Sequence, residues 1–143
     1  MDQSTNVRPA RLEDLPYIFE LANQLSDSIK ISEQYIADNL QNYINDEHHF
    51  LYVVTEHETV VGYLSGYCHN AIYASGKVAY IDEIVVNARN RGMQFGSTLM
   101  SEFESICRQR GCQLISLATY GAKNFYENLG YYSKASYYKK YLN

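Results

Sequence analysis

Residues 80–100 decide the fold of this chain, and they read YIDEIVVNARNRGMQFGSTLM. Their first seven residues are β-branched or aromatic apart from two adjacent acids, which is typical of a strand. A polar loop with two glycines follows, and after Gly96 the apolar residues return at helical spacing. The stretch therefore predicts a strand, a polar loop and the start of a helix in direct succession.

The loop of residues 87–96 has the features of an anion-binding site. The start of a helix presents unpaired N–H groups and a partial positive charge. Gly92 and Gly96 allow a bulky phosphate to approach the backbone, and Arg89 and Arg91 add positive charge. The loop lacks the Gly-Lys-Ser/Thr of a P-loop and the glycine pattern of a dinucleotide loop. Taken alone, it is equally consistent with an ordinary strand-to-helix turn.

The rest of the chain changes its hydrophobic period several times, and residues 1–143 are interpreted as one domain. Only two prolines occur, and no repeat or linker interrupts the pattern. The order of elements indicates an α+β (mixed α/β) domain. We expect strands at 6–8, 50–55, 60–68, 77–86 and 114–117, helices at 12–25, 32–45, 96–110 and 122–129, a loop at 70–76, and a final strand pair at 131–132 and 136–141.

Charge and composition exclude several classes of protein. The chain has 12 Lys and Arg against 16 Asp and Glu, a net charge of −4, which suits nucleic-acid phosphates poorly. No apolar run reaches the length of a membrane span, and residues 1–4 do not begin a signal peptide. Cys68, Cys107 and Cys112 form an odd set without C-x-x-C spacing, which favours free thiols in the cytoplasm over disulfides or a metal site.

Residues 91–100 resemble the acetyl-CoA pyrophosphate loop of the GNAT superfamily of N-acetyltransferases. The family pattern is Gln/Arg-x-x-Gly/Ala-x-Gly/Ala followed by an apolar helix, and Arg91 and Gly96 match its first and last positions. Gln94 departs from the small residue of the middle position. The version with Gln is similar to that of eukaryotic glucosamine 6-phosphate N-acetyltransferases.

The resemblance extends over essentially the whole chain. Residues 80–86 are similar to the family's fourth strand, and residues 122–131 resemble its late Ala-x-x-Phe-Tyr-x-x-x-Gly-Phe/Tyr motif. The family's usual Asn ahead of that motif is missing, since Thr119 and Tyr120 lie there. The fold that this resemblance implies is a central, mixed but mostly antiparallel, twisted sheet of six to seven strands. About four helices flank the sheet, which is splayed between strands 4 and 5.

The resemblance also implies an N-acetyltransferase that uses acetyl-CoA as co-substrate, needs no metal and transfers the acetyl group directly. Backbone N–H groups of the fourth strand would hold the thioester oxygen, and residues 114–117 would form the opposite wall. The residues expected to bind acetyl-CoA are Ile84, Val85, Val86, Arg91, Gly92, Met93, Gln94, Phe95, Gly96, Ser97 and Asn124.

Asp82, Glu83 and Tyr126 are the candidate catalytic residues. At pH 7 the reactive neutral form of a lysine-like amine is disfavoured by about 4.6 kcal/mol, so a base is useful. Neighbouring strand residues point to opposite faces, so only one of the two acids is expected in a given cleft. By resemblance, Asp82 is the first choice of base and Glu83 the second, and Tyr126 is the general acid for the departing thiolate. The alternative for Tyr126 is plain packing.

The acceptor is expected to be a primary amine of a small molecule, of the polyamine, aminoglycoside or amino-sugar type. The 15 tyrosines suit either half-buried strand positions or an aromatic-lined site for a cation. A non-catalytic acyl-CoA sensor and a protein N-terminal or lysine acetyltransferase remain alternatives. The candidate acceptor-side residues are Tyr35, Tyr43, His48, His49, Tyr73, Tyr137 and Tyr138.

The aromatic-rich residues 136–141 are expected to form an edge strand that needs covering. Members of the resembled family often dimerise through such strands. We therefore expect a homodimer, with no nucleic-acid or membrane partner.

Overall fold

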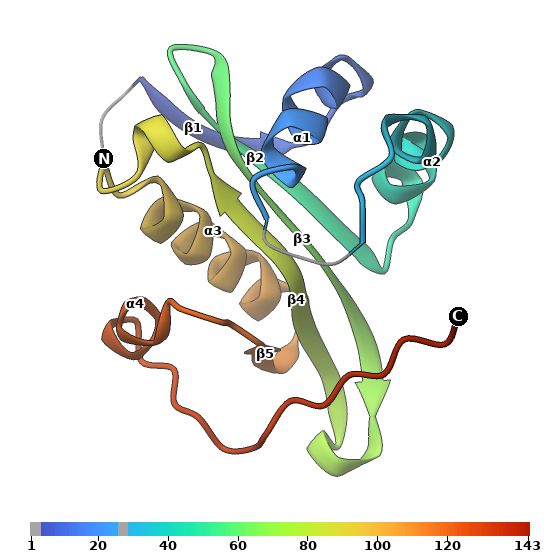
Figure 1. Cartoon of the computed structure of the whole chain (residues 1–143). Coiled ribbons are helices and arrows are strands. Elements are labelled where there is room, and N and C mark those ends of the chain that lie inside the picture. The colour runs from blue at the N-terminus through green and yellow to red at the C-terminus, as the bar shows by residue number, and fades with distance from the viewer. Residues whose placement is uncertain (1–3, 26–28) are drawn as a thin grey trace.

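The computed structural model describes residues 4–25 and 29–143 (Figure 1). Residues 1–3, part of the segment interpreted as lacking a signal peptide, lie outside the described residues. The strands are β1 (Thr5–Pro9), β2 (His49–Glu56), β3 (Thr59–Ala71), β4 (Gly76–Val86) and β5 (Cys112–Leu117). The helices are α1 (Leu15–Ala22), α2 (Glu33–Asn45), α3 (Phe95–Gln109) and α4 (Lys123–Asn128), with short 3-10 turns at Leu12–Asp14, Ile72–Ala74 and Ala88–Asn90.

The strands form one mixed sheet in the order β1-β2-β3-β4-β5. The first three pairs are antiparallel, and only β4 and β5 run parallel. The expected strands at 50–55 and 60–68 form a hairpin, β2 and β3, and both residues of its turn, His57 and Glu58, have positive φ. That geometry matches the right-handed twist of the paired strands. The expectation of a mostly antiparallel mixed sheet with four helices is thus confirmed.

The expectation of six to seven strands is not met, because the sheet of the described chain has five. Residues 131–143 follow α4 as an irregular segment, almost entirely exposed, with no helix or strand. Two pairs of adjacent tyrosines and the Lys139–Lys140 pair interrupt the alternation of apolar and polar residues. Without that alternation the segment has no apolar face to hold it on the sheet.

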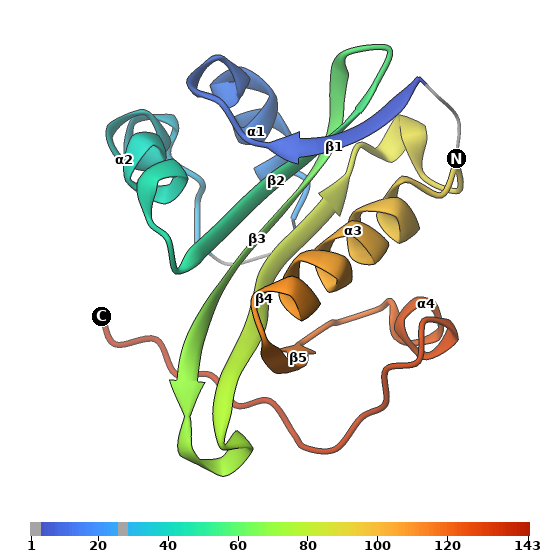
Figure 2. The same cartoon turned by 180° about the vertical axis from the view of Figure 1, so that it is seen from behind.

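Helices cover both faces of the sheet and enclose two cores (Figures 1 and 2). The α3 face is filled by Phe50, Leu64, Leu99, Met100 and Phe103, among others. The α1/α2 face is filled by Leu21, Leu40, Val53, Tyr63 and Val85, among others. Within the described residues, no helix is long and apolar enough to cross a membrane.

The ends of the helices follow from local sequence signals. The Ser32 hydroxyl accepts a hydrogen bond from the Tyr35 N–H at 3.0 Å and caps α2. Gly111 has φ 79° directly after α3, the left-handed conformation that commonly ends a helix. The two helices lie within one residue of the expected ranges 32–45 and 96–110, and Gly111 fixes the point at which the chain turns into β5.

Strand β4 extends beyond the end of its pairing with β5. Its pairing with β5 ends at Ile81 opposite Leu117, whereas β4 itself continues to Val86. Residues 82–86 therefore have β3 on one side and, among the described residues, no strand on the other. Backbone groups along that unpaired edge are available to a ligand.

Candidate functional site

The loop between β4 and α3 brings backbone N–H groups and an arginine together. Gly92 and Gln94 have φ of 82° and 69°, so the chain turns sharply before α3 begins at Phe95. The Gln94 carbonyl accepts hydrogen bonds from the N–H and the hydroxyl of Thr98 at 3.0 and 2.9 Å. The first N–H groups of α3 have no partner within the helix, which makes this end of α3 suited to an anion.

Arg91 lies at the rim of this loop. Its Nε donates to the Val86 carbonyl at 3.3 Å, so the guanidinium is anchored at the end of β4 and remains exposed. Since a guanidinium offers five donors, the others are free to bind a phosphate.

A cavity of about 430 Å³ opens between β4, this loop and α4. It occupies the place where β5 no longer pairs with β4. Tyr126, a catalytic candidate, lines it, as do Asn90, Ala122 and Phe125, which were not expected. Eight residues expected to bind acetyl-CoA also line it: Ile84, Val86, Arg91, Gly92, Gln94, Phe95, Gly96 and Ser97.

Three expected cofactor residues do not line the cavity. Val85 is 4% exposed and packs in the α1/α2 core, because β4 turns alternate side chains to opposite faces. Met93 is 54% exposed, and Asn124 is exposed on α4. Phe125, by contrast, belongs to the quoted late motif and packs within 3.4 Å of where a Cβ at Gly96 would stand. The position of Phe125 in that motif was the sequence signal that could have identified it as a cavity residue.

Tyr126 reaches the cavity from α4. The ring is 7% exposed and packs edge-on against Phe125 and Tyr131, at 5.0 and 5.9 Å between ring centroids. Burial raises the pKa of the phenol, so it stays protonated at neutral pH. The short helix is held by Thr119, whose hydroxyl accepts from the Ala122 N–H at 3.2 Å. The Thr in place of the family's Asn thus stabilises the start of α4.

A β-bulge brings both acids of β4 to the same face of the sheet. Ser65 lies opposite Glu83 and Gly66 opposite Ile81, so Asp82 is the extra residue. The prediction that alternation separates the two acids is therefore wrong, because alternation is interrupted between them. Their proximity is apparent in the pKa of Asp82, which burial and the charge of Glu83 raise to about 6.

The two acids differ in their contacts. The Tyr63 hydroxyl donates to Glu83 Oε1 at 2.6 Å, and Tyr63 itself is 1% exposed in the α1/α2 core. Among the described residues, Asp82 makes no hydrogen bond or ion pair. Asp82 is thus the freer carboxylate, and its raised pKa suits proton transfer near neutral pH. Sequence reasoning missed Tyr63, whose link to Glu83 depends on the bulge.

Further aromatic residues gather on the same face. Tyr35 and Tyr43 of α2 share a hydrogen bond of 2.7 Å between their hydroxyls, and the ring of Tyr43 packs on that of His49. His49 Nε2 lies 2.8 Å from the Ser65 hydroxyl, and burial lowers the pKa of the imidazole. The pKa of Tyr43 is raised by burial, by Tyr35 and by both acids of β4, which indicates that these groups face one another.

The remaining acceptor-side candidates are distributed differently. Burial raises the pKa of Tyr80, and the neighbouring phenol of Tyr137, in the segment after α4, raises it further, so Tyr137 lies near this part of β4. Tyr73 and Tyr138 are 75% and 88% exposed.

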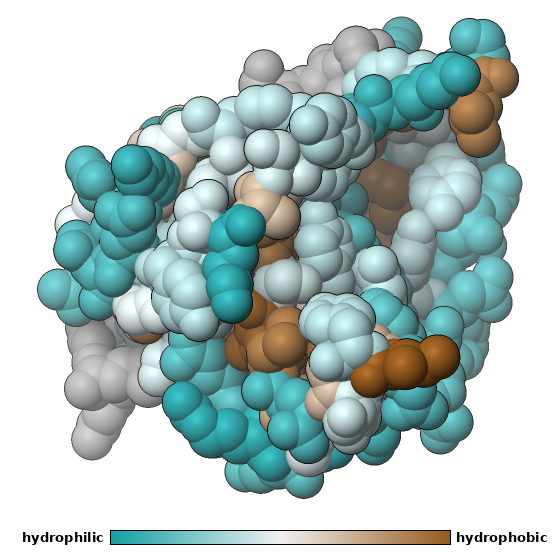
Figure 3. All heavy atoms as spheres, turned by 90° about the horizontal axis from the view of Figure 1, so that it is seen from below, coloured by the Kyte–Doolittle hydropathy of each residue, from teal (hydrophilic) through white to brown (hydrophobic). Residues whose placement is uncertain are grey.

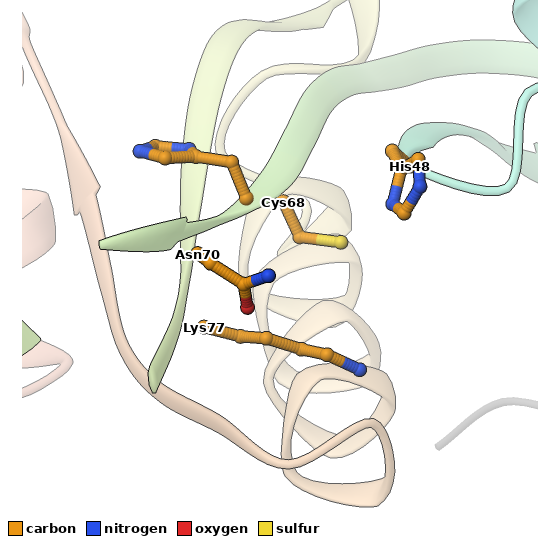
Figure 4. A pocket seen from close by; sticks show the side chains of 5 residues that line it. His48, Cys68, Asn70 and Lys77 are labelled. Carbon is orange, nitrogen blue, oxygen red and sulfur yellow. The ribbon is translucent and has the colours of Figure 1, made fainter. Parts of the chain in front are cut away.

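His48 lies apart, in a second cavity of about 250 Å³ (Figure 4). Cys68, His69, Asn70 and Lys77 also line this cavity, and Lys77 Nζ donates to the carbonyl of Arg110 at the end of α3. The two cavities thus lie at opposite ends of α3.

The cysteines offer no activated nucleophile. All three are free, and Cys68 and Cys107 are buried. Burial and the neighbouring Cys112 raise the pKa of the Cys107 thiol to about 12. The thiol form dominates at neutral pH, and a thiol is a poor nucleophile.

Comparisons with known proteins agree with this geometry. The profile described as "Acetyltransferase (GNAT) family" matches residues 15–131. A proposed [ribosomal protein bS18]-alanine N-acetyltransferase of Bacillus subtilis (strain 168) is 24% identical over 134 residues, covering 91% of this chain and 82% of the relative.

Two solved structures illustrate how widely the fold is shared. A glucosamine-6-phosphate N-acetyltransferase from Arabidopsis thaliana superposes with a TM-score of 0.85 at 22% identity, covering 99% of this chain and 100% of the other. An aminoglycoside acetyltransferase from an uncultured soil metagenomic sample gives a TM-score of 0.78 at 15% identity, covering 99% of both chains. At these identities the likeness concerns the fold. Because the family profile spans most of the chain and its motifs surround the cavity, this protein belongs to the GNAT family of N-acetyltransferases.

Proposed function

We propose that this protein transfers the acetyl group of acetyl-CoA directly to a primary amine of a small molecule, of the polyamine, aminoglycoside or amino-sugar type. The observation that carries the proposal is the position of the cavity beside β4. It is bordered by the anion-binding end of α3 and by Tyr126, and Ile84 in its wall directly follows the two acids.

The cavity fits acetyl-CoA, the acetyl donor of the GNAT family. Arg91 and the first N–H groups of α3 would hold the pyrophosphate. The unpaired edge of residues 84–86 would receive the carbonyl oxygen of the thioester through backbone N–H groups. Acetyl-CoA supplies an activated acetyl group, and every other function in the site comes from side chains and backbone of the chain.

Asp82 and Tyr126 handle different protons in the proposed reaction: Asp82 accepts one from the acceptor, and Tyr126 donates one to the departing sulfur. The acceptor ammonium loses a proton to Asp82, directly or through water, and its nitrogen then forms the bond to the acetyl carbon. The carbon–sulfur bond breaks, and the sulfur takes the proton held on Tyr126 Oη. The second proton of the amine passes to solvent, and solvent restores the proton of the phenol. The raised pKa values of Asp82 and Tyr126 fit these two roles.

The test is a turnover assay of acetyl-CoA against a panel of amines, reading the released thiol. Thiol release that requires an amine, together with mass-spectrometric detection of the acetylated amine, supports the proposal. Binding of acetyl-CoA without turnover on any amine or peptide would favour the sensor alternative. Acetylation of peptides beginning with Ala and not of small amines would favour the activity named for the Bacillus subtilis relative.

We also propose that the protein is a homodimer, assembled at the end where the β3–β4 hairpin and the C-terminal segment lie. Viewed from that end, apolar groups are visible on the surface (Figure 3). Ile72 and Leu142 are 99% and 93% exposed. A second copy would remove such side chains from water. Light scattering at tens of micromolar protein is expected to give twice the chain mass, and a monomer mass would contradict the proposal.

The expected location of the protein is the cytoplasm. Cys68, Cys107 and Cys112 are all unpaired, and free thiols are typical of a reducing compartment. Determining the fraction in which the native protein is recovered would test this expectation.

A further inference from the structure

The α1/α2 face of β4 carries an unusual set of ionisable groups. Asp82 and Glu83 lie side by side at the bulge, and none of the ion pairs among the described residues involves either of them. The acids are adjacent and like-charged, and each charge is costly beside the other. A cation bound between them would remove this cost.

The surroundings of these acids are rich in phenols, with the imidazole of His49 packed beside Tyr43. The groups that face Asp82, Glu83 and one another across this face come from α2, β3, β4 and the C-terminal segment. They are Tyr35, Tyr43, Tyr63, Tyr67, Tyr80 and Tyr137. Phenol rings bind ammonium groups through their faces, and phenol oxygens accept hydrogen bonds from them.

Within the part of the chain that the structure describes, no Lys or Arg forms an ion pair with Asp82 or Glu83. The groups that shift the pKa values of Tyr43, Tyr63, Tyr80 and Asp82 are carboxyl groups and phenols, and no Lys or Arg is among them. An acceptor phosphate placed here would lack a counter-charge and would lie near two carboxylates. This face therefore disfavours a sugar phosphate, although the Gln94 loop is similar to that of glucosamine-phosphate enzymes.

Asp82 and Glu83 differ in their hydrogen-bond partners, which suits them to different roles. Glu83 is held at 2.6 Å by the phenol of Tyr63, which is buried and therefore fixed in position. This hydrogen bond fixes the position of the carboxylate group. Asp82 has no such partner among the described residues and is free to meet the reacting nitrogen.

We propose that the acceptor is an unphosphorylated amine carrying a second ammonium group, that Glu83 binds this second group, and that Asp82 faces the amine that reacts. Tyr63 is the positioning residue for Glu83. The proposal rests on the acetyltransferase activity proposed above and specifies its substrate class and the division of labour between the two acids.

The decisive experiment measures binding without chemistry. Calorimetry on the protein saturated with CoA compares 1,4-diaminobutane with butylamine, which has the same carbon chain and one ammonium group. We expect the diamine to bind about ten-fold more tightly, the size expected for one ion pair with aromatic support. Glu83→Gln should abolish the difference by weakening the diamine alone. Equal affinities in the wild type would overturn the proposal.

Steady-state kinetics then test Tyr63. With the diamine, Tyr63→Phe should raise KM several-fold while kcat changes less than two-fold, and the KM of butylamine should stay the same. A structural role alone would alter both amines equally, which would contradict positioning. Thermal denaturation checks that the variant folds; if it does not, Glu83→Gln, which leaves the buried phenol in place, carries the test.

Binding of further ligands distinguishes the possible sources of the second ammonium group. It also separates failure of the proposed substrate class from failure of the proposed activity. Kanamycin against spermidine distinguishes an aminoglycoside from a linear polyamine. Stronger binding of glucosamine 6-phosphate, or of a peptide beginning with Ala, than of every diamine would overturn the substrate class. Diamine-selective binding without acetylation of any amine would overturn the proposed activity and leave the substrate class standing.

Discussion

The two surfaces of β4 beyond Ile81 contrast sharply. On the side of the cavity the strand presents Ile84 and Val86, and the polar contacts there come from backbone groups and the loop before α3. On the opposite face it presents Asp82 and Glu83 among phenols. The apolar donor side and the acidic acceptor side are thus opposite faces of one strand, whose edge beyond Ile81 is not paired with β5. Catalysis is expected where these two surfaces meet.

The largest effect is expected at Tyr126, the residue proposed to act at the junction. Tyr126→Phe keeps the ring and removes the phenol proton, so kcat should fall by about 10²–10⁴-fold, while acetyl-CoA affinity changes little. Tyr131→Phe is the matched control, because its phenol donates to Glu104 outside the cavity. Rapid-mix kinetics with the best amine measure both variants. Near-full turnover of Tyr126→Phe would make the phenol structural.

The donor side alone is tested by Arg91→Glu. At about 100 times its Kd, acetyl-CoA should stabilise the wild type by about 2.7 kcal/mol, or roughly 10 °C in Tm. The variant should lose most of this shift, because a carboxylate would face the pyrophosphate. Arg108→Glu makes the same charge change at the other end of α3, and acetyl-CoA should raise the Tm of this variant as much as that of the wild type. Equal shifts in all three proteins would refute the loop assignment.

The bulge that separates the two surfaces is tested by Gly66→Ala. A Cβ at Gly66 would overlap the Tyr80 carbonyl oxygen directly beside the bulge. We expect the substitution to destabilise the protein by about 1–3 kcal/mol, as overpacking does, and to lower the affinity for amines. Gly121→Ala, with open space around the added methyl, is the control. Chemical denaturation measures both, and an unchanged Gly66→Ala would contradict the close approach of β3 and β4.

The smallest effect is expected from Asp82→Asn on stability. Asp82 has a pKa of about 6 in the folded protein against an ordinary 3.8, so its ionisation weakens the fold as pH rises between these values. The variant should therefore have a Tm higher by roughly 1–2 °C at pH 7.5, the size expected for relieving one pair of like charges. At pH 3 the two proteins should melt together. A lower Tm at pH 7.5 would show that the charge of Asp82 is stabilising.

The donor side could be predicted from sequence because its determinants are local. Arg91, Gly92 and Gly96 lie within six residues, and the helix that follows has a clear apolar period. Three residues of the expected cofactor set, Val85, Met93 and Asn124, do not line the cavity. Val85 was expected to contribute through its backbone N–H, and its side chain packs in the α1/α2 core.

The acceptor side could be predicted only in outline, since its geometry depends on pairing between distant residues. The bulge follows from the register of β3 against β4, for which Gly62 and Gly66 were the available signal, as both allow close backbone approach. The contact of Tyr63 with Glu83 follows from that bulge. Residues 131–132 and 136–141 were expected as strands from their tyrosine content, but they lack the alternation of apolar and polar residues that would hold them on the sheet.

The bulge at Asp82 also has a consequence for how this strand tolerates change in length. Side chains of a strand repeat with a period of two, so one additional residue is a shift of half a period. Ala79 and Ile81 before the bulge, and Ile84 and Val86 after it, all serve the α3 core because of that shift. Deleting Asp82 would remove the extra residue, so Ile81 and Glu83 would stay opposite Gly66 and Ser65 and the side chains beyond them would keep their faces. A one-residue deletion at the bulge should thus preserve both cores and remove one of the two adjacent acids, whereas a one-residue insertion in β4 has no such extra residue to absorb it.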